Sequence, residues 1–191
     1  MYQIYNIDAL VLNQYDGNAD GTVSILMWTR EFGKIYAVLR GGRKISSKMI
    51  GHLQCGGFAN VDMVHGIYDW HIIGAKTIQY TAPNLKNQNE FLAWQRILSF
   101  IKQFSGTSES TELFDKISRI NWEIFGTGAN DHNLELFAKI LILQHFGYWG
   151  DGIVNKALLN NDDREYIFTI LEKNKIRLEN KIDSIIVGSY L

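Results

Sequence analysis

The spacing of the hydrophobic residues changes once along this chain, at Pro83, which is the only proline. Before Pro83, apolar and β-branched residues alternate with polar ones in short runs, a pattern typical of β-strands. After it, apolar residues recur at three- and four-residue spacings, a pattern typical of amphipathic helices. We therefore expect an α+β protein, with a β domain over residues 1–82 and an α-helical bundle over residues 83–191.

Five strands are expected before Pro83, over residues 3–14, 22–29, 34–40, 53–64 and 68–80. Turn residues in the sequence DGNADG separate the first two, and the pair Gly56-Gly57 indicates a bulge in the fourth. The longest connection lies between the third and fourth strands. Five strands in this arrangement predict a small closed β-barrel of the oligonucleotide/oligosaccharide-binding (OB) type, with a half-open sandwich as the alternative.

Four helical segments are expected after Pro83. Asn87 and Glu90 resemble a capping box at the start of the first, which ends at Gly106. The others cover residues 108–126, residues 130–146, and a long run from Asp163 whose apolar stripe Asn174 interrupts. The third is apolar on nearly every side, so we expect it at the centre of the bundle. The residues expected to face inward are Phe91, Trp94, Leu98, Ile101, Leu113, Ile117, Ile120, Ile124, Leu134, Leu136, Phe137, Ile140, Leu141, Leu143, Ile167, Leu171, Leu178, Ile182 and Ile185.

Composition places the chain among folded proteins. Of its 191 residues 46% are hydrophobic and 20% are charged, which excludes a disordered tail or a coiled-coil rod. No run of apolar residues is long enough to cross a membrane, and the N-terminus lacks a secretory signal, so we expect a cytoplasmic protein without membrane contact. The single cysteine, Cys55, excludes an internal disulfide and a zinc site built of several thiolates.

Positive charge is concentrated in one stretch, residues 29–48. The net charge of the chain is −1, whereas this stretch has six lysines and arginines against Glu31 alone, a local charge of 6 − 1 = +5. Several basic side chains on one surface can neutralise the phosphates of a nucleic acid, and an aromatic side chain among them can stack on a base. An ordinary solvated run of charges is the alternative. The candidate DNA-binding residues are Arg30, Lys34, Tyr36, Arg40, Arg43, Lys44 and Lys48.

The sequence provides no catalytic or metal-binding pattern. DGNADG matches the first half of an EF-hand loop, but the twelfth position is Met27 rather than an acid, so a hairpin turn is favoured. His52, His65 and His71 lack the spacing of a zinc site. A Walker loop, a nucleophile elbow, paired catalytic acids and Rossmann glycines are all missing. We therefore expect no enzymatic activity, no cofactor and no metal.

Four stretches together resemble the RecO recombination-mediator family of bacterial DNA repair. ALVLNQY resembles the family's opening strand, and TREFGKIYAVLRGGRK resembles its Thr-x-x-x-Gly-Lys strand with the basic loop that follows. HLQCGGF stands where the family has Leu-Gln-Pro-Phe, and LELFAKILILQHFGY is similar to its central helix. Three departures are clear. Gln54 is followed by Cys55 rather than proline, and Gly42 replaces the usual alanine. No cysteine follows Tyr148, where many members carry a zinc module.

The resemblance implies a short, zinc-free protein of DNA recombination and repair. Such a protein would bind single- and double-stranded DNA, anneal complementary strands and associate with the nucleoid. It would act with a RecR-type protein and with the single-stranded-DNA-binding protein, whose acidic C-terminal tail would enter an apolar groove of the bundle beside a base such as Lys139 or Arg119. Two other functions remain open from the residues alone: a protein-interaction module, and an RNA-binding OB protein.

Overall fold

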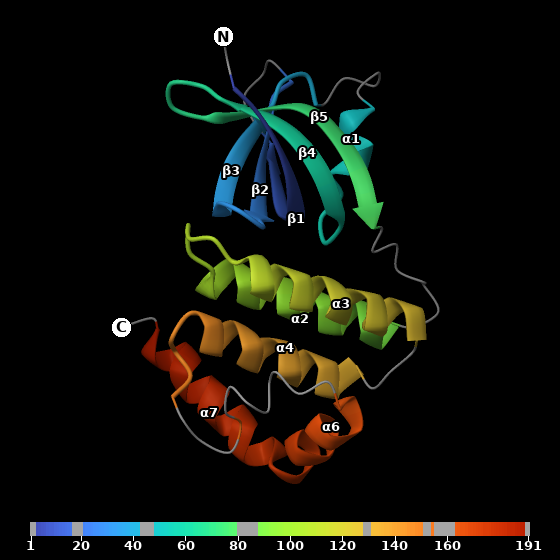
Figure 1. Cartoon of the computed structure of the whole chain (residues 1–191), viewed down its shortest axis with the longest axis vertical. Coiled ribbons are helices and arrows are strands. Elements are labelled where there is room, and N and C mark those ends of the chain that lie inside the picture. The colour runs from blue at the N-terminus through green and yellow to red at the C-terminus, as the bar shows by residue number, and fades with distance from the viewer. Residues whose placement is uncertain are drawn as a thin grey trace.

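The computed structural model describes residues 3–16, 21–42, 48–79, 88–127, 131–150, 154 and 163–189. Figure 1 shows a ring of strands at one end of the molecule and successive layers of helices below it. The expected α+β organisation, with strands first and helices second, is confirmed. The expected boundary falls between Gln79 and Gln88, and Pro83 itself lies outside the described residues.

The strands are β1 (Ile4–Asp16), β2 (Val23–Thr29), β3 (Gly33–Leu39), β4 (Phe58–His65) and β5 (Trp70–Gln79). They neighbour one another in the order β1-β2-β3-β5-β4, and β4 pairs with β1, so the five-stranded sheet closes into a ring. The β3–β5 pairing is parallel and short, whereas the other four are antiparallel. A closed sheet avoids long unpaired edges that would recruit other chains.

The prediction for residues 53–64 is wrong in its first half. Residues 49–52 form a short helix, α1 (Met49–His52), a turn follows, and β4 begins only at Phe58. Gly56 has a φ of 83°, a left-handed conformation that glycine adopts without steric cost. Its N–H donates to the carbonyl of Val11 at 2.7 Å, and the N–H of Val11 donates to the carbonyl of Gly57 at 3.0 Å. The pairing of β1 with β2 shifts register between Val11 and Asn13, close to the two glycines, and the pairing of β4 with β5 shifts between Phe58 and Ala59 and between Asp62 and Met63.

The interior of the ring is filled by the alternate side chains of each strand. The buried members of this cluster are Ile7, Ala9, Val11, Val23, Ile25, Met27, Ala37, Leu39, Leu53, Ala59, Val61, Met63 and Ile72. Three aromatic rings contact one another beside this core. Phe32 and Trp70 have ring centroids 5.1 Å apart, and Tyr5 lies 5.2 Å from Trp70. The size of Trp70 predicts that it is buried. It is only half-buried, because it lies in this aromatic cluster beside the core.

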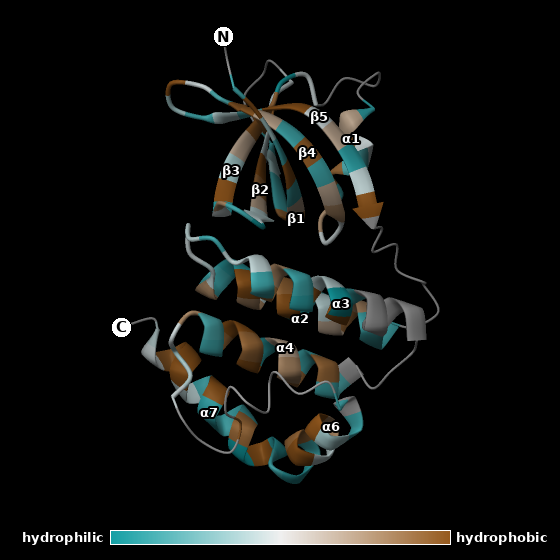
Figure 2. Cartoon of the chain, viewed as in Figure 1, coloured by the Kyte–Doolittle hydropathy of each residue, from teal (hydrophilic) through white to brown (hydrophobic). Residues whose placement is uncertain are grey.

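The helical half consists of α2 (Gln88–Phe104), α3 (Thr111–Thr127), α4 (Asp131–His145), α6 (Arg164–Lys173) and α7 (Lys175–Gly188). In Figure 1, α4 lies between the α2–α3 layer and the α6–α7 layer, and Figure 2 shows hydrophobic residues along much of it. All six of its apolar residues named above are buried, so the predicted central position is confirmed. Among the described residues, no helix combines the length and the apolar character needed to span a membrane.

The predicted helical stripes agree with the observed burial, with one clear exception. Phe91 is exposed, and Ala93, Ile97 and Phe100 complete the buried face of α2. The helix ends lie close to the expected positions, although α3 begins at Thr111 rather than near residue 108 and runs through Gly126 to Thr127. The carboxylate of Asp163 accepts a hydrogen bond from the N–H of Tyr166 and caps α6, and Asn174 separates α6 from α7. Asn87 of the expected capping box, and the side chain of Ile124, lie outside what the structure describes.

One continuous apolar cluster joins the outer side of the ring to the helices. Leu10, Leu12, Leu26, Trp28 and Phe58 come from the strands, and the remaining members come from the helices or from Trp149 and Val154 beyond α4. Trp28 is fully buried and packs against Phe114, with ring centroids 5.3 Å apart. The helices are thus docked on the ring through a large buried surface, which is a strong favourable contribution to stability.

Candidate nucleic-acid interface

The outer face of β3 carries the central part of the expected site. Ile35, Ala37 and Leu39 point toward the interior of the ring, so Lys34, Tyr36 and Arg40 alternate with them on the outer side. Tyr36 is 60% exposed, which leaves most of its ring accessible to a stacking partner. The predicted alternation along this strand is therefore confirmed.

The neighbouring part of β2 is not available to a ligand. Tyr36 is paired with Leu26, and Lys34 with Trp28, yet both β2 residues are buried beneath the helices. In OB folds the face of strands 2 and 3 is a common binding surface for oligonucleotides. Here the helices cover the β2 half of that face, so Trp28 cannot stack on a base, and a narrower surface along β3 is left.

Two side chains that the sequence did not single out complete this surface. Tyr15 of β1 lies 6.1 Å from Tyr36 between ring centroids, and the ammonium of Lys102, in the last turn of α2, lies 5.6 Å from the centre of the Tyr15 ring. The register shift between Val11 and Asn13 reverses the alternation of β1, so Tyr15 reaches the outer face. We call Lys34, Tyr36, Tyr15 and Lys102 the seam site, because they join the sheet to α2.

The electrostatics of the seam site reflect its concentration of positive charge. Burial, and then the charge of Lys102, lower the pKa of the Lys34 ammonium below its ordinary value. A hydrogen bond with Asn13, and then one with Lys102, lower the pKa of the Tyr15 phenol. Within the part of the chain that the structure describes, neither Lys34 nor Lys102 takes part in an ion pair.

Lys34 also has a structural role at the end of α2. Its ammonium donates a hydrogen bond of 2.8 Å to the carbonyl of Lys102, and its backbone N–H donates one of 2.8 Å to the carbonyl of Gly106. The last carbonyls of a helix lack partners within the helix, and a basic side chain that binds them is stabilising. Lys34 is therefore shared between the end of α2 and the exposed surface.

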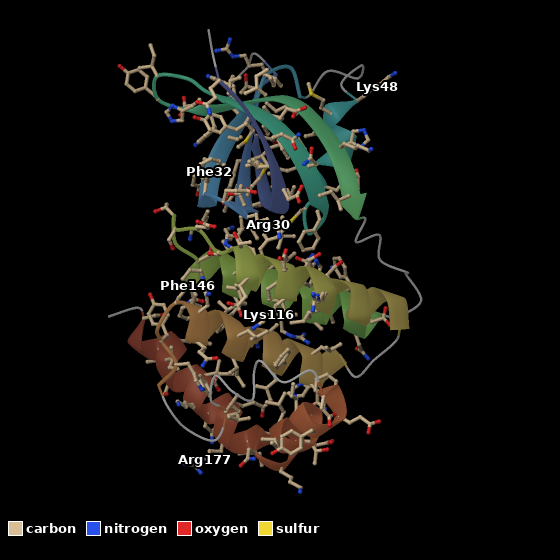
Figure 3. The ribbon with its side chains drawn as sticks, viewed as in Figure 1. Arg30, Phe32, Lys48, Lys116, Phe146 and Arg177 are labelled. Atoms are coloured by element: carbon tan, nitrogen blue, oxygen red, sulfur yellow. The ribbon has the colours of Figure 1, made fainter. Side chains whose placement is uncertain are left out.

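Arg30 lies at the contact between the ring and the helices rather than on the outer face of β3. Its guanidinium forms an ion pair of 2.7 Å with Asp115 of α3, and its carbonyl accepts a hydrogen bond of 3.3 Å from the N–H of Ser110. Figure 3 shows Arg30 directly above α3. Its position is better suited to holding the two halves together than to binding phosphate.

The turn between β2 and β3 fits closely against the α2–α3 connection. The hydroxyl of Thr29 accepts a hydrogen bond from the N–H of Phe32 at 3.0 Å and donates one to the carbonyl of Gly33 at 2.9 Å. Gly33 has a φ of 63°, and a Cβ atom there would lie 2.5 Å from the carbonyl oxygen of Ser108. The Thr-x-x-x-Gly-Lys pattern is thus explained in this chain by the docking of the turn.

Arg40 lies at the other end of β3, beside the hairpin that joins β4 to β5. It lines an open, largely apolar hollow with His71, Ile73 and the hairpin residues Ile67 and Tyr68. Ile67 is 87% exposed and Tyr68 is 90% exposed, and Figure 2 shows hydrophobic residues in this projecting hairpin. Neither side chain was predicted to lie at a functional surface, because an isolated apolar pair in a turn carries no periodic signal.

Of the remaining expected DNA-binding residues, Lys48 is described, and it does not join this surface. Lys48 is exposed at the start of α1, and Figure 3 shows it on the opposite side of the ring from Phe32. Arg43 and Lys44 lie outside the described residues. The structure therefore brings together Lys34 and Tyr36 with Arg40 along one strand, and separates Arg30 and Lys48 from them.

His52, His65 and Cys55 have ordinary structural contacts, whereas the Nδ1 atom of His71 is buried without a hydrogen-bond partner among the described residues. The imidazole of His52 lies 2.9 Å from the hydroxyl of Thr77, and the ring of His65 packs against Trp70 at 4.8 Å. The thiol of Cys55 donates to the carbonyl of Leu12 at 3.2 Å, and burial raises its pKa. Among the described residues no three potential metal ligands come together; most of DGNADG lies outside these ranges.

The bases suggested for a tail-binding groove differ in their surroundings. Lys139 is already paired with Glu135, at 2.6 Å, and Arg96 binds the other oxygen of that carboxylate at 2.7 Å. This ion-pair group lines a hollow between α2, α4 and α7 that also contains Glu179 and Asp183. Acidic side chains around Lys139 make this hollow a poor site for an acidic peptide, whereas Arg119 is exposed on α3.

No protein-family model matches the chain, and no curated protein matches its sequence.

Proposed function

We propose that this protein is a non-enzymatic DNA-binding protein of the OB type, which holds a single strand along the outer face of β3. The observation that carries the proposal is Tyr36, an exposed aromatic ring on the same face as Lys34 and close to Tyr15, which Lys102 contacts. Proteins that bind single strands without sequence preference combine a positive groove with aromatic rings on which bases stack. This face carries both kinds of side chain, the basic residues Lys34 and Lys102 and the aromatic rings of Tyr36 and Tyr15.

The arrangement of the strands supports the OB interpretation. The order β1-β2-β3-β5-β4, the parallel contact of β3 with β5, and a helix between β3 and β4 are features that fit this fold. OB proteins bind oligonucleotides through strands 2 and 3 and through the loops between β1 and β2 and between β4 and β5. A single strand of DNA that lies along β3 would continue past Arg40 to the β4–β5 hairpin, where Tyr68 offers a second ring on which a base can stack.

The biological role that we propose follows the resemblance to the RecO family. The protein would be an accessory of DNA repair and recombination that also binds double-stranded DNA, promotes annealing and helps to load the recombinase. It would do so with a RecR-type protein and the single-stranded-DNA-binding protein in the nucleoid. This role rests on the resemblance of all four stretches taken together. A single stretch is not enough, because Arg30, Gly33 and Lys34 of the second one also have the structural roles given above.

The exposed hairpin supports a second candidate, a protein-interaction module. Ile67 and Tyr68 are exposed next to the largely apolar hollow that Arg40 lines, and a contiguous exposed apolar surface can mark a contact with another protein. In that case Arg40 would pair with an acidic group of the partner, and DNA binding would be negligible.

A direct binding measurement separates the two candidates. Fluorescence anisotropy of a labelled thymine oligonucleotide, at low and at moderate salt, should show binding that weakens as salt rises, because each phosphate contact releases counterions. An RNA oligonucleotide of equivalent sequence tests the remaining OB alternative by competition. If the protein binds neither DNA nor RNA at low salt, the DNA-binding function is excluded and the protein-interaction module is favoured.

A further inference from the structure

The seam site is assembled from both halves of the protein. Tyr15 comes from β1, Lys34 and Tyr36 come from β3, and Lys102 comes from the last turn of α2. The contacts are continuous: the Lys34 ammonium binds the Lys102 carbonyl, the Lys102 ammonium lies over the Tyr15 ring, and the Tyr15 ring neighbours Tyr36. A ligand bound here would contact the sheet and the helical half together.

The two lysines of the seam site have no negative partner among the residues that the structure describes. Burial and the charge of Lys102 both disfavour the charged form of Lys34, and they lower its pKa. An ammonium group has three hydrogen-bond donors, and the bond to the Lys102 carbonyl uses one of those on Lys34. Donors therefore remain for an anion, and an anion placed between the two ammonium groups would relieve their repulsion.

We propose that one backbone phosphate of the bound DNA strand lies between the ammonium groups of Lys34 and Lys102. The DNA strand thereby stabilises the docking of α2 against the sheet, an effect that we call the fastening of α2. This proposal rests on the DNA-binding function proposed above, and it makes the helical half part of the binding site. The base next to this phosphate stacks on Tyr36, whose ring is the most exposed of the seam site.

Binding and docking of the two halves are then linked. A ligand that binds the docked arrangement better than a loosened one shifts the equilibrium toward the docked arrangement. The reporter of docking is the N–H of Lys34, because its acceptor is the carbonyl of Gly106 in the α2–α3 connection. An oligonucleotide should therefore slow hydrogen exchange at this N–H.

Lys102→Gln in the full chain tests the proposal, with Lys173→Gln as the matched control. Lys173 is also an exposed lysine near the C-terminal end of its helix, but it lies on α6, far from the ring. Lys102→Gln removes one of the two ammonium groups on this phosphate, so the slope of log K against log salt should fall by up to about 0.7, and binding at 0.15 M salt should weaken by up to about fourfold. Lys173→Gln should leave both quantities unchanged.

The two proposals fail in different ways. If the unmodified protein binds the oligonucleotide but Lys102→Gln binds as tightly as Lys173→Gln does, α2 is not part of the binding site and the present proposal is overturned, while DNA binding stands. If the unmodified protein does not bind at low salt, both proposals are overturned. If Lys102→Gln weakens binding but the oligonucleotide does not slow exchange at the Lys34 N–H of the unmodified protein, the phosphate contact holds and the fastening of α2 is refuted.

Discussion

The guanidinium of Arg30 lies 2.7 Å from the carboxylate of Asp115, so a base from the most positive stretch of the chain joins the strand ring to α3. Both side chains are partly exposed, which limits the free energy that such an ion pair contributes. Its position between the two halves nevertheless makes it a test of how they dock.

A double-mutant cycle measures this pair. Arg30→Met and Asp115→Asn should each lower the free energy of unfolding, with a coupling energy of about 0.5–1 kcal/mol between them. Urea denaturation of the four proteins gives the values. Arg30→Met should leave the salt slope of oligonucleotide binding as it is in the unmodified protein. A slope reduced by a full phosphate contact would instead return Arg30 to the binding surface.

Gly33→Ala should destabilise the protein more than most single substitutions do. The new Cβ would lie 2.5 Å from the Ser108 carbonyl oxygen and 2.6 Å from that of Gly106, and the φ of 63° disfavours alanine in any case. We expect a loss of about 2 kcal/mol or more in the free energy of unfolding.

Gly51→Ala is the control for this substitution. Gly51 lies in α1, and nothing lies within 4 Å of the Cβ position there. Alanine in a helix is favoured over glycine by about 0.5–1 kcal/mol, so this variant should be as stable as the unmodified protein or slightly more stable. Equal effects of the two substitutions would show that the turn is not tightly held against the α2–α3 connection.

Tyr36→Ala tests base stacking on the outer face of β3. Without the Tyr36 ring, one base loses its stacking partner, which should weaken single-strand binding by about 1–3 kcal/mol. The salt slope should stay the same, because no charged side chain is removed. Tyr166→Ala is the matched control, since Tyr166 is 52% exposed, against 60% for Tyr36, but lies on α6. The prediction is wrong if anisotropy titrations give equal affinities for the two variants.

The basic loop after β3 is tested by replacing Arg43 and Lys44 with alanine together. If both side chains neutralise phosphates of a single strand, the salt slope should fall by about 0.7 for each phosphate that is no longer neutralised. The reduction in affinity should be similar for oligonucleotides of different sequence, because phosphates are the same at every position. Normal binding by this double variant at every salt concentration would confine the interface to β3 and its neighbours.

Glu135 should make stability depend on acidic pH. Its side chain is 6% exposed, and burial by itself would raise its pKa, but hydrogen bonds from Arg96 and Lys139 outweigh burial and lower it. Because the folded pKa lies below the unfolded one, this contribution is complete above the unfolded value of about 4.3 and is lost as the pH falls through the folded value.

The measurement compares the unmodified protein with Glu135→Gln. At pH 7 we expect the variant to be less stable by about 1–3 kcal/mol, since it lacks the hydrogen bonds between charged groups. The difference should begin to shrink as the pH falls below the unfolded value of about 4.3, because the unfolded chain then takes up a proton that folded Glu135 does not. Urea denaturation at several pH values checks this, and a difference that stays constant down to pH 3 would contradict it.

Most of the helices and strands could be located from sequence patterns, because hydrophobic period is a local property of the chain. The change of period at Pro83, the alternation that places Tyr36 and Lys34 on one side of β3, and the all-round apolar character of α4 could each be read from neighbouring residues. The fourth strand was misplaced because Gly56 and Gly57 form a turn against β1, a contact between segments distant in sequence.

Which side chains share a surface depends on the packing of segments that are distant in sequence. No local sequence pattern predicts this packing. Tyr15 reaches Tyr36 only because a bulge in β1 reverses its alternation, and Lys102 reaches them only because α2 docks against the sheet. Arg30 leaves the surface for Asp115, although its charge and its position in the chain resemble those of its neighbours. The sequence shows how many charged side chains are available. The docking of segments that are distant in sequence determines which of these side chains face a ligand and which hold the fold together.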